Sequence, residues 1–227
     1  MGDRFDRLSG TAWSEATTVA GFAQSPPNPQ LIQYAARQRS TTLKILDIGC
    51  GAGRNAVPLA MSGANVLGTD LSWPMLVAAT ARDAGGSLRL VVSPMDTLPV
   101  RDRCIDLVIA HGIWNLARSG GEFRRAIREA ARVAAPEARL FVFTFSRTTL
   151  PPDAQPVVGE AFVFTQFSGS PQVFLTREQL FDELRQTGFE ADRDLPVREL
   201  NVPPPGQVRM GGAPVIFEAG FRFIGAS

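Results

Sequence analysis

The chain has 227 residues, a length that suits one α/β domain with enough chain to bury a core and form a ligand cleft. Its 23 basic and 22 acidic side chains nearly balance, which argues against a binding surface for a nucleic-acid backbone. Its two cysteines, Cys50 and Cys104, lie far apart without a C-x-x-C partner, so neither a disulfide framework nor a metal site is expected.

The chain contains no apolar run long enough to span a bilayer, and its N-terminus is charged and lacks the apolar segment of a secretory signal. We therefore expect a cytoplasmic protein without a membrane partner. Lys44 is the only lysine, and the other basic side chains that carry a full charge are arginines. Codon usage explains this bias more simply than function does.

Residues 1–28 are expected to form an arm ahead of the first helix of the core, which Asn28 caps and Pro29 opens. The arm carries two large apolar side chains, Trp13 and Phe22, and something must cover them or be covered by them. One interpretation is a surface arm whose aromatic residues plug an edge of the core. The other is a lid across the ligand cleft, because closure excludes water from the reaction.

A glycine-rich turn, 49–53, follows the first predicted strand, 43–48, and has the pattern Gly-x-Gly-x-Gly. Glycines permit positive φ and close approach of a ligand, and the helix predicted from Arg54 adds free N–H groups. A dinucleotide fold would instead use Gly-x-Gly-x-x-Gly to hold a pyrophosphate. Asp47 precedes the turn, and a carboxylate suits a ligand with positive charge, such as S-adenosylmethionine.

An acid, Asp70, ends the second predicted strand, 65–70, where a nucleotide-binding βαβ unit places its ribose-binding acid. Capping of the next helix is the simpler role for an acid at this point, but Ser72 already supplies that cap. The third strand, 88–92, leads into a proline-bounded segment, 93–99, which contains a further acid.

The fourth predicted strand, 104–110, ends at the point where doubly wound sheets bind ligands. The only histidine, His111, follows it directly and is a candidate to touch the cofactor or the substrate and to act as general base. A helix over 122–134 and a strand over 139–145 come next.

The connection 146–175 is long and rich in phenylalanine, and we expect it to form an insert on the substrate side. A capping box at Thr176 opens a further helix. Two strands, 197–201 and 215–223, are expected to form an antiparallel hairpin at the end of the chain.

The sequence Leu-Asp-Ile-Gly-Cys-Gly-Ala-Gly-Arg, 46–54, resembles motif I of the class I S-adenosylmethionine-dependent methyltransferases, in particular small-molecule enzymes of type 11/25. Asp70, Asp96 and the segment 111–115 then match the order of the later motifs in that family. The resemblance implies a doubly wound, Rossmann-like α/β fold with a seven-stranded sheet, mostly parallel with an antiparallel C-terminal strand, as a single domain over 1–227.

The resemblance also implies the cofactor, S-adenosyl-L-methionine, and its product, S-adenosyl-L-homocysteine. Within the family the acid matched by Asp70 binds the ribose and the acid matched by Asp96 accepts from the adenine amino group. Asn115 stands where many relatives have an aromatic residue or a histidine. The cofactor-binding residues expected on this basis are Asp47, Gly49, Cys50, Gly51, Gly53, Arg54, Asn55, Asp70, Leu71, Met75, Met95, Asp96, Thr97, His111 and Gly112.

Methyl transfer from a sulfonium requires alignment, desolvation and in some cases deprotonation, and it does not require a fixed triad. Aromatic side chains with scattered arginines favour a small, partly apolar acceptor, methylated at O, N or S. The expected substrate and lid residues are Trp13, Phe22, Trp114, Asn115 and Arg147.

Two alternatives stay open. One is methylation of RNA or protein, against which stands the absence of a basic stripe. The other is a protein that binds the cofactor without methylating, which turnover of labelled cofactor would distinguish. We expect a monomer or a homodimer.

Overall fold

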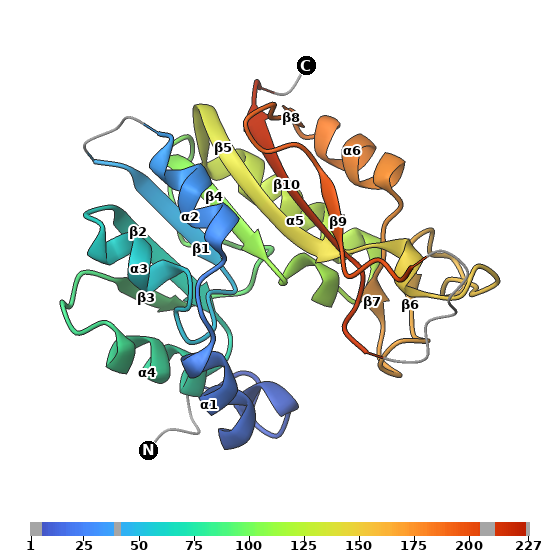
Figure 1. Cartoon of the computed structure of the whole chain (residues 1–227), viewed down its shortest axis with the longest axis horizontal. Helices are drawn as coiled ribbons and strands as arrows, with labels where there is room; N and C mark the ends of the chain where they lie inside the picture. The colour runs from blue at the N-terminus through green and yellow to red at the C-terminus, as the bar shows by residue number, and fades with distance from the viewer. Residues whose placement is uncertain (1–5, 39–41, 205–211, 226–227) are drawn as a thin grey trace.

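A mixed sheet forms the centre of the chain in the computed structural model, which describes residues 6–38, 42–204 and 212–225 (Figure 1). Within these ranges the sheet has eight strands in the order β3-β2-β1-β4-β5-β10-β8, and β9 pairs with β10. Its strands are β1 (Lys44–Ile48), β2 (Asn65–Asp70), β3 (Arg89–Val92), β4 (Ile105–His111), β5 (Ala134–Phe145), β8 (Phe189–Ala191), β9 (Arg198–Leu200) and β10 (Ile216–Phe223).

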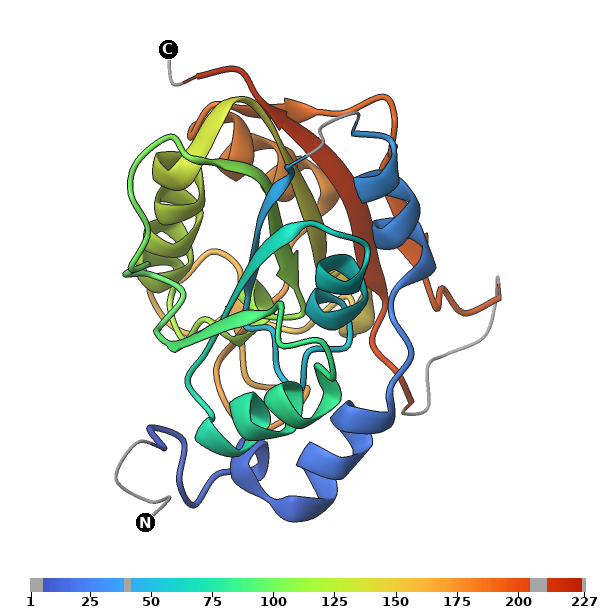
Figure 2. The ribbon, with the colours of Figure 1, turned by 90° about the vertical axis from the view of Figure 1, so that its left-hand side faces the viewer.

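Helices cover both faces of this sheet (Figure 2). The side chains of α2, α3 and α4 pack with Ile45, Leu107 and Phe141 on one face. Those of α5 and α6 pack with Leu46, Val108 and other side chains on the opposite face. The helices are α1 (Ala16–Gln24), α2 (Pro29–Ala36), α3 (Ala56–Met61), α4 (Trp73–Arg82), α5 (Gly120–Val133) and α6 (Arg177–Arg185), with short 3₁₀ turns η1 (Ala12–Ser14), η2 (Trp114–Leu116) and η3 (Arg147–Thr149).

The strand directions confirm the predicted doubly wound architecture. β1 to β5 pair in parallel, whereas β10 pairs antiparallel with β5, β8 and β9. The carboxyl ends of the parallel strands therefore meet at one edge, where such sheets bind ligands. The segment 146–175 contains a small separate sheet of β6 (Val163–Phe164) and β7 (Gln172–Val173).

Two elements differ from the sequence predictions. The sheet has an eighth strand, β8, where seven were predicted. This strand was missed because its three residues after Gly188 are too few to show an alternating pattern. The first helix is α1, not the helix at Pro29. α1 has no side-chain cap, so no local signal marks its start, and it packs against α4 instead.

Some boundaries also shift. α3 begins at Ala56, two residues later than predicted, because the chain turns through Arg54 and Asn55 before the helix starts. β5 begins at Ala134, directly after α5, and is longer than the predicted strand. No helix within the described ranges is long and apolar enough to cross a membrane.

Candidate functional site

The glycine turn after β1 requires glycine for two separate reasons. Gly49, Gly51 and Gly53 all have positive φ, at 67°, 54° and 73°. A Cβ at Gly49 would lie 2.6 Å from the Ile113 side chain, and one at Gly53 would lie 2.8 Å from Val57. At Gly51 the same atom would meet only ordinary van der Waals contacts, with Phe22 of the arm at 3.8 Å and the Met75 sulfur at 4.0 Å.

Asp70 ties the glycine turn to the end of β2. Its Oδ2 accepts from the Gly51 N–H at 2.9 Å and its Oδ1 accepts from the Ser72 N–H at 2.8 Å. Burial raises the pKa of Asp70, and these amides oppose the shift. Each carboxylate oxygen can accept a further hydrogen bond, so Asp70 keeps acceptors for two hydroxyl groups.

Asp47 is a buried carboxylate at the end of β1, with 1% of its surface exposed. Its Oδ1 has no hydrogen-bond partner among the described residues. Burial raises the pKa of Asp47 to about 7, the Asp70 charge adds to this shift, and the Arg54 charge opposes it. A buried carboxylate with an open oxygen favours a ligand that carries positive charge and N–H donors, as S-adenosylmethionine does.

The side chains that neighbour Asp70 and the glycine turn point in different directions. Met75, buried in the first turn of α4, has its sulfur 4.0 Å from where a Gly51 Cβ would lie, and Leu71 is half-buried next to Asp70. The Cys50 side chain instead points toward β2, because its sulfur lies 2.7 Å from where a Gly68 Cβ would be. Cys50 thus contributes its backbone, not its thiol, to the turn.

The structure gives less support to a cofactor role for the segment after β3. The Asp96 Oδ2 accepts from Arg125 Nε at 3.1 Å, Met95 is buried in the core, and Thr97 is exposed. The adenine role expected for Asp96 stays a prediction. Gly112, with φ of 74°, donates its N–H to the Phe143 carbonyl at 2.7 Å and has open space at its Cβ position.

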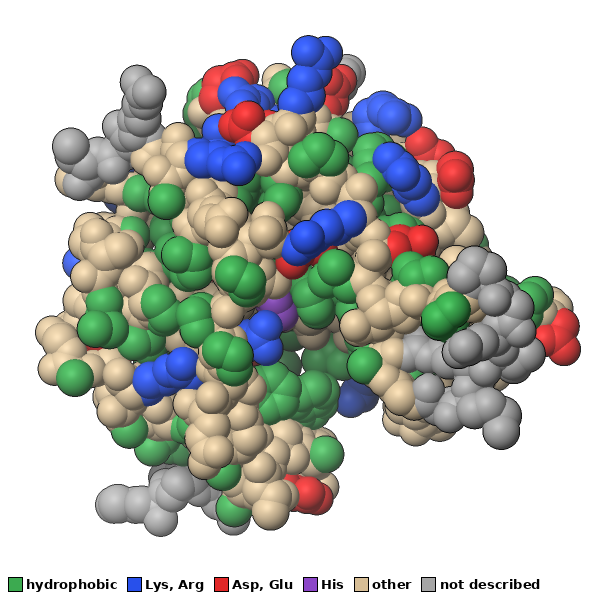
Figure 3. Space-filling view, in the orientation of Figure 1, with side chains coloured by type: hydrophobic (Ala, Val, Ile, Leu, Met, Phe, Trp, Pro, Cys, Tyr) green, Lys and Arg blue, Asp and Glu red, His purple; other side chains and the backbone are tan. Residues whose placement is uncertain are grey.

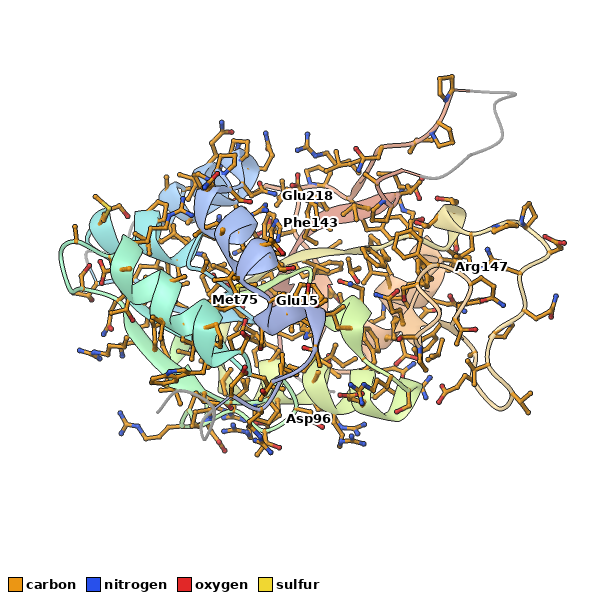
Figure 4. The ribbon with its side chains drawn as sticks, turned by 90° about the horizontal axis from the view of Figure 1, so that it is seen from below. Glu15, Met75, Asp96, Phe143, Arg147 and Glu218 are labelled. Atoms are coloured by element: carbon orange, nitrogen blue, oxygen red, sulfur yellow. The ribbon has the colours of Figure 1, made fainter. Side chains whose placement is uncertain are left out.

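One row of side chains crosses the face of the sheet that α2 covers. His111 of β4 is in register with Phe143 of β5, Phe143 with Glu218 of β10, and Glu218 with Arg198 of β9. Residues in register across strands project from the same face. In Figure 4, which views the molecule from below, Phe143 and Glu218 lie close together near the centre.

His111 stacks on Phe143, with ring centroids 4.1 Å apart and planes 9° from parallel. Its Nε2 lies 3.2 Å from Arg54 Nη2 and 3.4 Å from Asn28 Nδ2, and both of these atoms are donors. Burial and the Arg54 charge lower the pKa of His111 to about 3. The ring is therefore a neutral acceptor at Nε2, which favours a role as a binding surface over one as general base.

The histidine is accessible from outside. Figure 3 shows the single histidine side chain at the floor of a hollow, beside a basic side chain and apolar groups. A second row follows toward the carboxyl edge, where Phe145, Ile216 and Leu200 are in register. Phe145 also packs against Phe167 and Phe174 of the 146–175 segment. The floor thus changes from polar and aromatic near His111 to apolar further out.

Asn28 connects the arm to this row. Its backbone N–H donates to Asn55 Oδ1 at 2.9 Å, and its side-chain oxygen caps α2. Its Nδ2 donates to Glu218 Oε2 at 2.8 Å. Sequence reasoning identified Asn28 only as a cap and missed Glu218 and Arg198. An acid among the apolar residues that begin β10 was the available signal.

The arm packs on α4, beside the glycine turn. The Ser72 hydroxyl donates to the Trp13 carbonyl at 3.0 Å, and the Arg82 guanidinium donates to the carbonyls of Ala23 and Ser25 at 2.8 and 3.0 Å. Phe22 packs tilted against Trp13, at 5.9 Å between centroids, and approaches Gly51. Figure 1 shows α1 beside α4 below the carboxyl ends of the parallel strands.

The structure does not bring three predicted substrate residues into this hollow. Trp114 is completely buried against Phe123, because the η2 turn rotates it into the core, and Asn115 is 2% exposed. Arg147 donates to carbonyls of its own segment, among them Leu150 and Ala154. In Figure 4 it lies far from Met75 and Glu15.

A separate cavity of about 340 Å³ lies between η3, the start of α6 and β9, and its lining includes Thr148, Glu178, Glu199 and Phe217. Phe217 projects from the face of the sheet opposite to His111, since it packs with the α5 and α6 side. This cavity is therefore distinct from the hollow over His111, although Arg198 borders it as well.

Comparison with known proteins matches this chain to methyltransferases. Residues 46–142 match the methyltransferase domain family. Demethylmenaquinone methyltransferase of Corynebacterium urealyticum is 30% identical over 207 residues, which cover 82% of this chain and 84% of that protein. The protein of the same name from Corynebacterium efficiens is 38% identical over 109 residues, and there the match spans only 44% of the relative's length.

The fold also matches solved structures. A Burkholderia thailandensis 1,6-didemethyltoxoflavin-N1-methyltransferase, solved with bound 1,6-didemethyltoxoflavin and S-adenosylhomocysteine, superimposes with a TM-score of 0.64 at 17% identity. The match covers 93% of this chain and 80% of that one. At this identity the likeness concerns the fold alone.

Proposed function

Because the chain belongs to the class I S-adenosylmethionine-dependent methyltransferases, we propose that it methylates a small aromatic acceptor that carries ring oxygens, of the hydroquinone type. The observation that supports this acceptor class is the stacked pair of His111 and Phe143 in the hollow beside the glycine turn. The relatives named for demethylmenaquinone, a quinone, point to the same class.

When bound, S-adenosylmethionine supplies a methyl group on a sulfonium. The acceptor reacts as the phenolate, having released its proton to water, and forms the new bond to that methyl group, while the electrons of the broken S–CH₃ bond stay on sulfur. Asp47 and Asp70 would hold the ammonium and the ribose, and the glycine turn would let the ligand approach the backbone. The arm would exclude water from the charged reactants.

His111 would contribute a flat surface, not a proton acceptor. Its Nε2 already faces the Arg54 and Asn28 donors, and a neutral imidazole with its lone pair engaged is a poor base. Packing of an acceptor ring over the edges of His111 and Phe143 would fix the plane of the acceptor relative to the methyl donor. The methyl acceptor is a ring oxygen or the ring carbon next to it.

Turnover of labelled S-adenosylmethionine with 1,4-dihydroxynaphthalene tests the proposal. We expect methylated product, and nuclear magnetic resonance of that product distinguishes a C–CH₃ from an O–CH₃ group. His111→Phe should keep most activity, since it preserves the stacking ring, whereas His111→Ala should raise the acceptor KM about 5- to 10-fold, from a stacking loss of roughly 1 kcal/mol.

Tight binding of S-adenosylhomocysteine without turnover of any aromatic acceptor would contradict the proposal and support a cofactor-binding protein without activity. Product formed only with RNA or protein would support the macromolecular alternative.

A further inference from the structure

The row across the sheet ends in an arginine whose function the cofactor site does not explain. We propose that Arg198 is a specificity-determining residue that binds an anionic oxygen of the acceptor ring, and that Glu218 is the positioning residue that holds it. This inference rests on the proposed function, because it concerns the same acceptor site.

The position of Arg198 follows from strand register. Three strand spacings separate His111 from Arg198 along the row, roughly 14 Å at about 4.8 Å per spacing. An arginine side chain is long enough to shorten this span considerably when it turns back along the row. An aromatic acceptor lying over His111 and Phe143 would therefore have its far edge near the guanidinium.

Glu218 holds the guanidinium, and both of its carboxylate oxygens have partners. Only 1% of Glu218 is exposed, its Oε1 accepts from Arg198 Nε at 2.8 Å, and the same oxygen forms an ion pair with Arg198 Nη2 at 2.5 Å. Its Oε2 accepts from Asn28 Nδ2 at 2.8 Å. Both oxygens of this buried carboxylate therefore have donors from the protein, and the bonds to Arg198 fix the position of the guanidinium.

Arg198 keeps part of its binding capacity. Its side chain is 47% exposed, and no described residue other than Glu218 bonds to its guanidinium. The planar group has five N–H donors, so several stay available for an oxygen anion. Arg139 provides a contrast, because its side chain is only 13% exposed and pairs with Asp192 and Asp194.

A purely structural ion pair is the competing explanation. Buried pairs often contribute little net stability, and removing one partner is costly because the other charge is left alone. Such a pair would give Arg198→Gln lower thermal stability without any change in how an acceptor binds. The experiment must therefore report on the charge of the bound acceptor and not only on activity.

The probe is 4-nitro-1-naphthol, an aromatic ligand whose phenolate absorbs visible light. Titration with S-adenosylhomocysteine present gives both the dissociation constant and the pKa of the bound probe. In the parent protein we expect the bound pKa to lie below that of the free naphthol, because the guanidinium favours the phenolate. Arg198→Gln should weaken phenolate binding about 10- to 100-fold and raise the bound pKa correspondingly.

Matched variants separate the possibilities. Arg198→Lys should retain an intermediate affinity, and Glu218→Gln should lie between the parent and Arg198→Gln, since it removes the charge that orients the guanidinium. Arg222→Gln, further along β10, and Glu199→Gln, in the neighbouring cavity, should leave the bound pKa unchanged. Binding of S-adenosylhomocysteine should be the same in all of these variants within about twofold.

The outcomes are distinct. An unchanged bound pKa in folded Arg198→Gln, with hydroquinone methylation intact in the parent, would overturn this inference alone. A shift in Glu199→Gln instead would move the acceptor to the other cavity and also overturn it. Failure of the parent to bind the naphthol or to methylate any aromatic acceptor would overturn the proposed function.

Discussion

Asp47 and Asp70 end neighbouring parallel strands, yet their surroundings differ. Asp70 is half-buried and accepts from the amides of Gly51 and Ser72. Asp47 is almost fully buried, and one of its oxygens has no partner within the part of the chain that the structure describes. The first carboxylate is therefore held in place before any ligand binds. Burial of the Asp47 carboxylate costs desolvation free energy, which a cationic ligand can offset.

Substitution of Asp70 tests its proposed ribose role. We expect Asp70→Ala to weaken binding of S-adenosylhomocysteine by about 2–4 kcal/mol, because two hydrogen bonds to a charged acceptor are lost. Asp96→Ala should cost less, about 1–3 kcal/mol, since a single bond is involved. Calorimetry measures both, and an unchanged affinity in Asp70→Ala would remove Asp70 from the cofactor site.

The pKa of Asp47 gives a prediction about pH. Between pH 8 and pH 6 the carboxyl group passes from mostly ionised to mostly protonated, because burial holds its pKa at about 7. A cationic ligand binds the ionised form, so affinity for S-adenosylmethionine should fall about 10-fold over this range. The variant Asp47→Asn separates the titration of Asp47 from that of the ligand. Its affinity for S-adenosylmethionine should change less with pH. Equal pH dependence in the two proteins would contradict the prediction.

At the scale of elements, the arm packs on the surface of α4 without contributing a buried residue from α1. None of the residues of α1 is buried. The arm is bonded to Arg82 of α4 through the carbonyls of Ala23 and Ser25, and to Ser72, the N-cap of α4, through the carbonyl of Trp13. Few buried contacts are typical of segments that open without global unfolding. This supports the lid interpretation, which remains a proposal, over that of a plug in the core.

Removal of the arm tests this proposal. We expect deletion of residues 1–27 to leave a folded protein with weaker S-adenosylhomocysteine binding and little or no methyl transfer, because one wall of the site is lost. Arg82→Met should weaken binding of S-adenosylhomocysteine about 3- to 10-fold, because the arm loses the hydrogen bonds from the guanidinium to the carbonyls of Ala23 and Ser25. Arg185→Met, which breaks an exposed pair with Asp182, is the control. Full activity in the truncated protein would assign the arm to packing alone.

At the scale of the whole molecule, local patterns predicted the individual parallel strands and the glycine turn, because these depend on neighbours in sequence, whereas the order and direction of the strands were implied by the resemblance to the methyltransferases. β8 and α1 were missed, since one is three residues long and the other lacks a cap. Trp114 was predicted to contact substrate, but a 3₁₀ turn places it in the core. Nothing within a short window reports which way such a turn rotates its side chains.

The acceptor side of the site was the least predictable part. Asn28 and Glu218 are 190 positions apart, and they meet only because β10 inserts antiparallel beside β5. Arg198 joins them through the pairing of β9 with β10. Register between distant strands is a property of the assembled sheet, so the sequence indicated the cofactor side of the site and not this one.

The position of the only lysine has a practical consequence. Lys44 is exposed at the amino end of β1, and its backbone N–H donates to Asp106. The glycine turn lies at the other end of the same strand. Once the terminal amine has been blocked, a reagent that couples to lysine amines would attach the protein to a sensor chip or a fluorophore at one point. Every tethered molecule would then present its catalytic edge to the flowing solution in the same orientation.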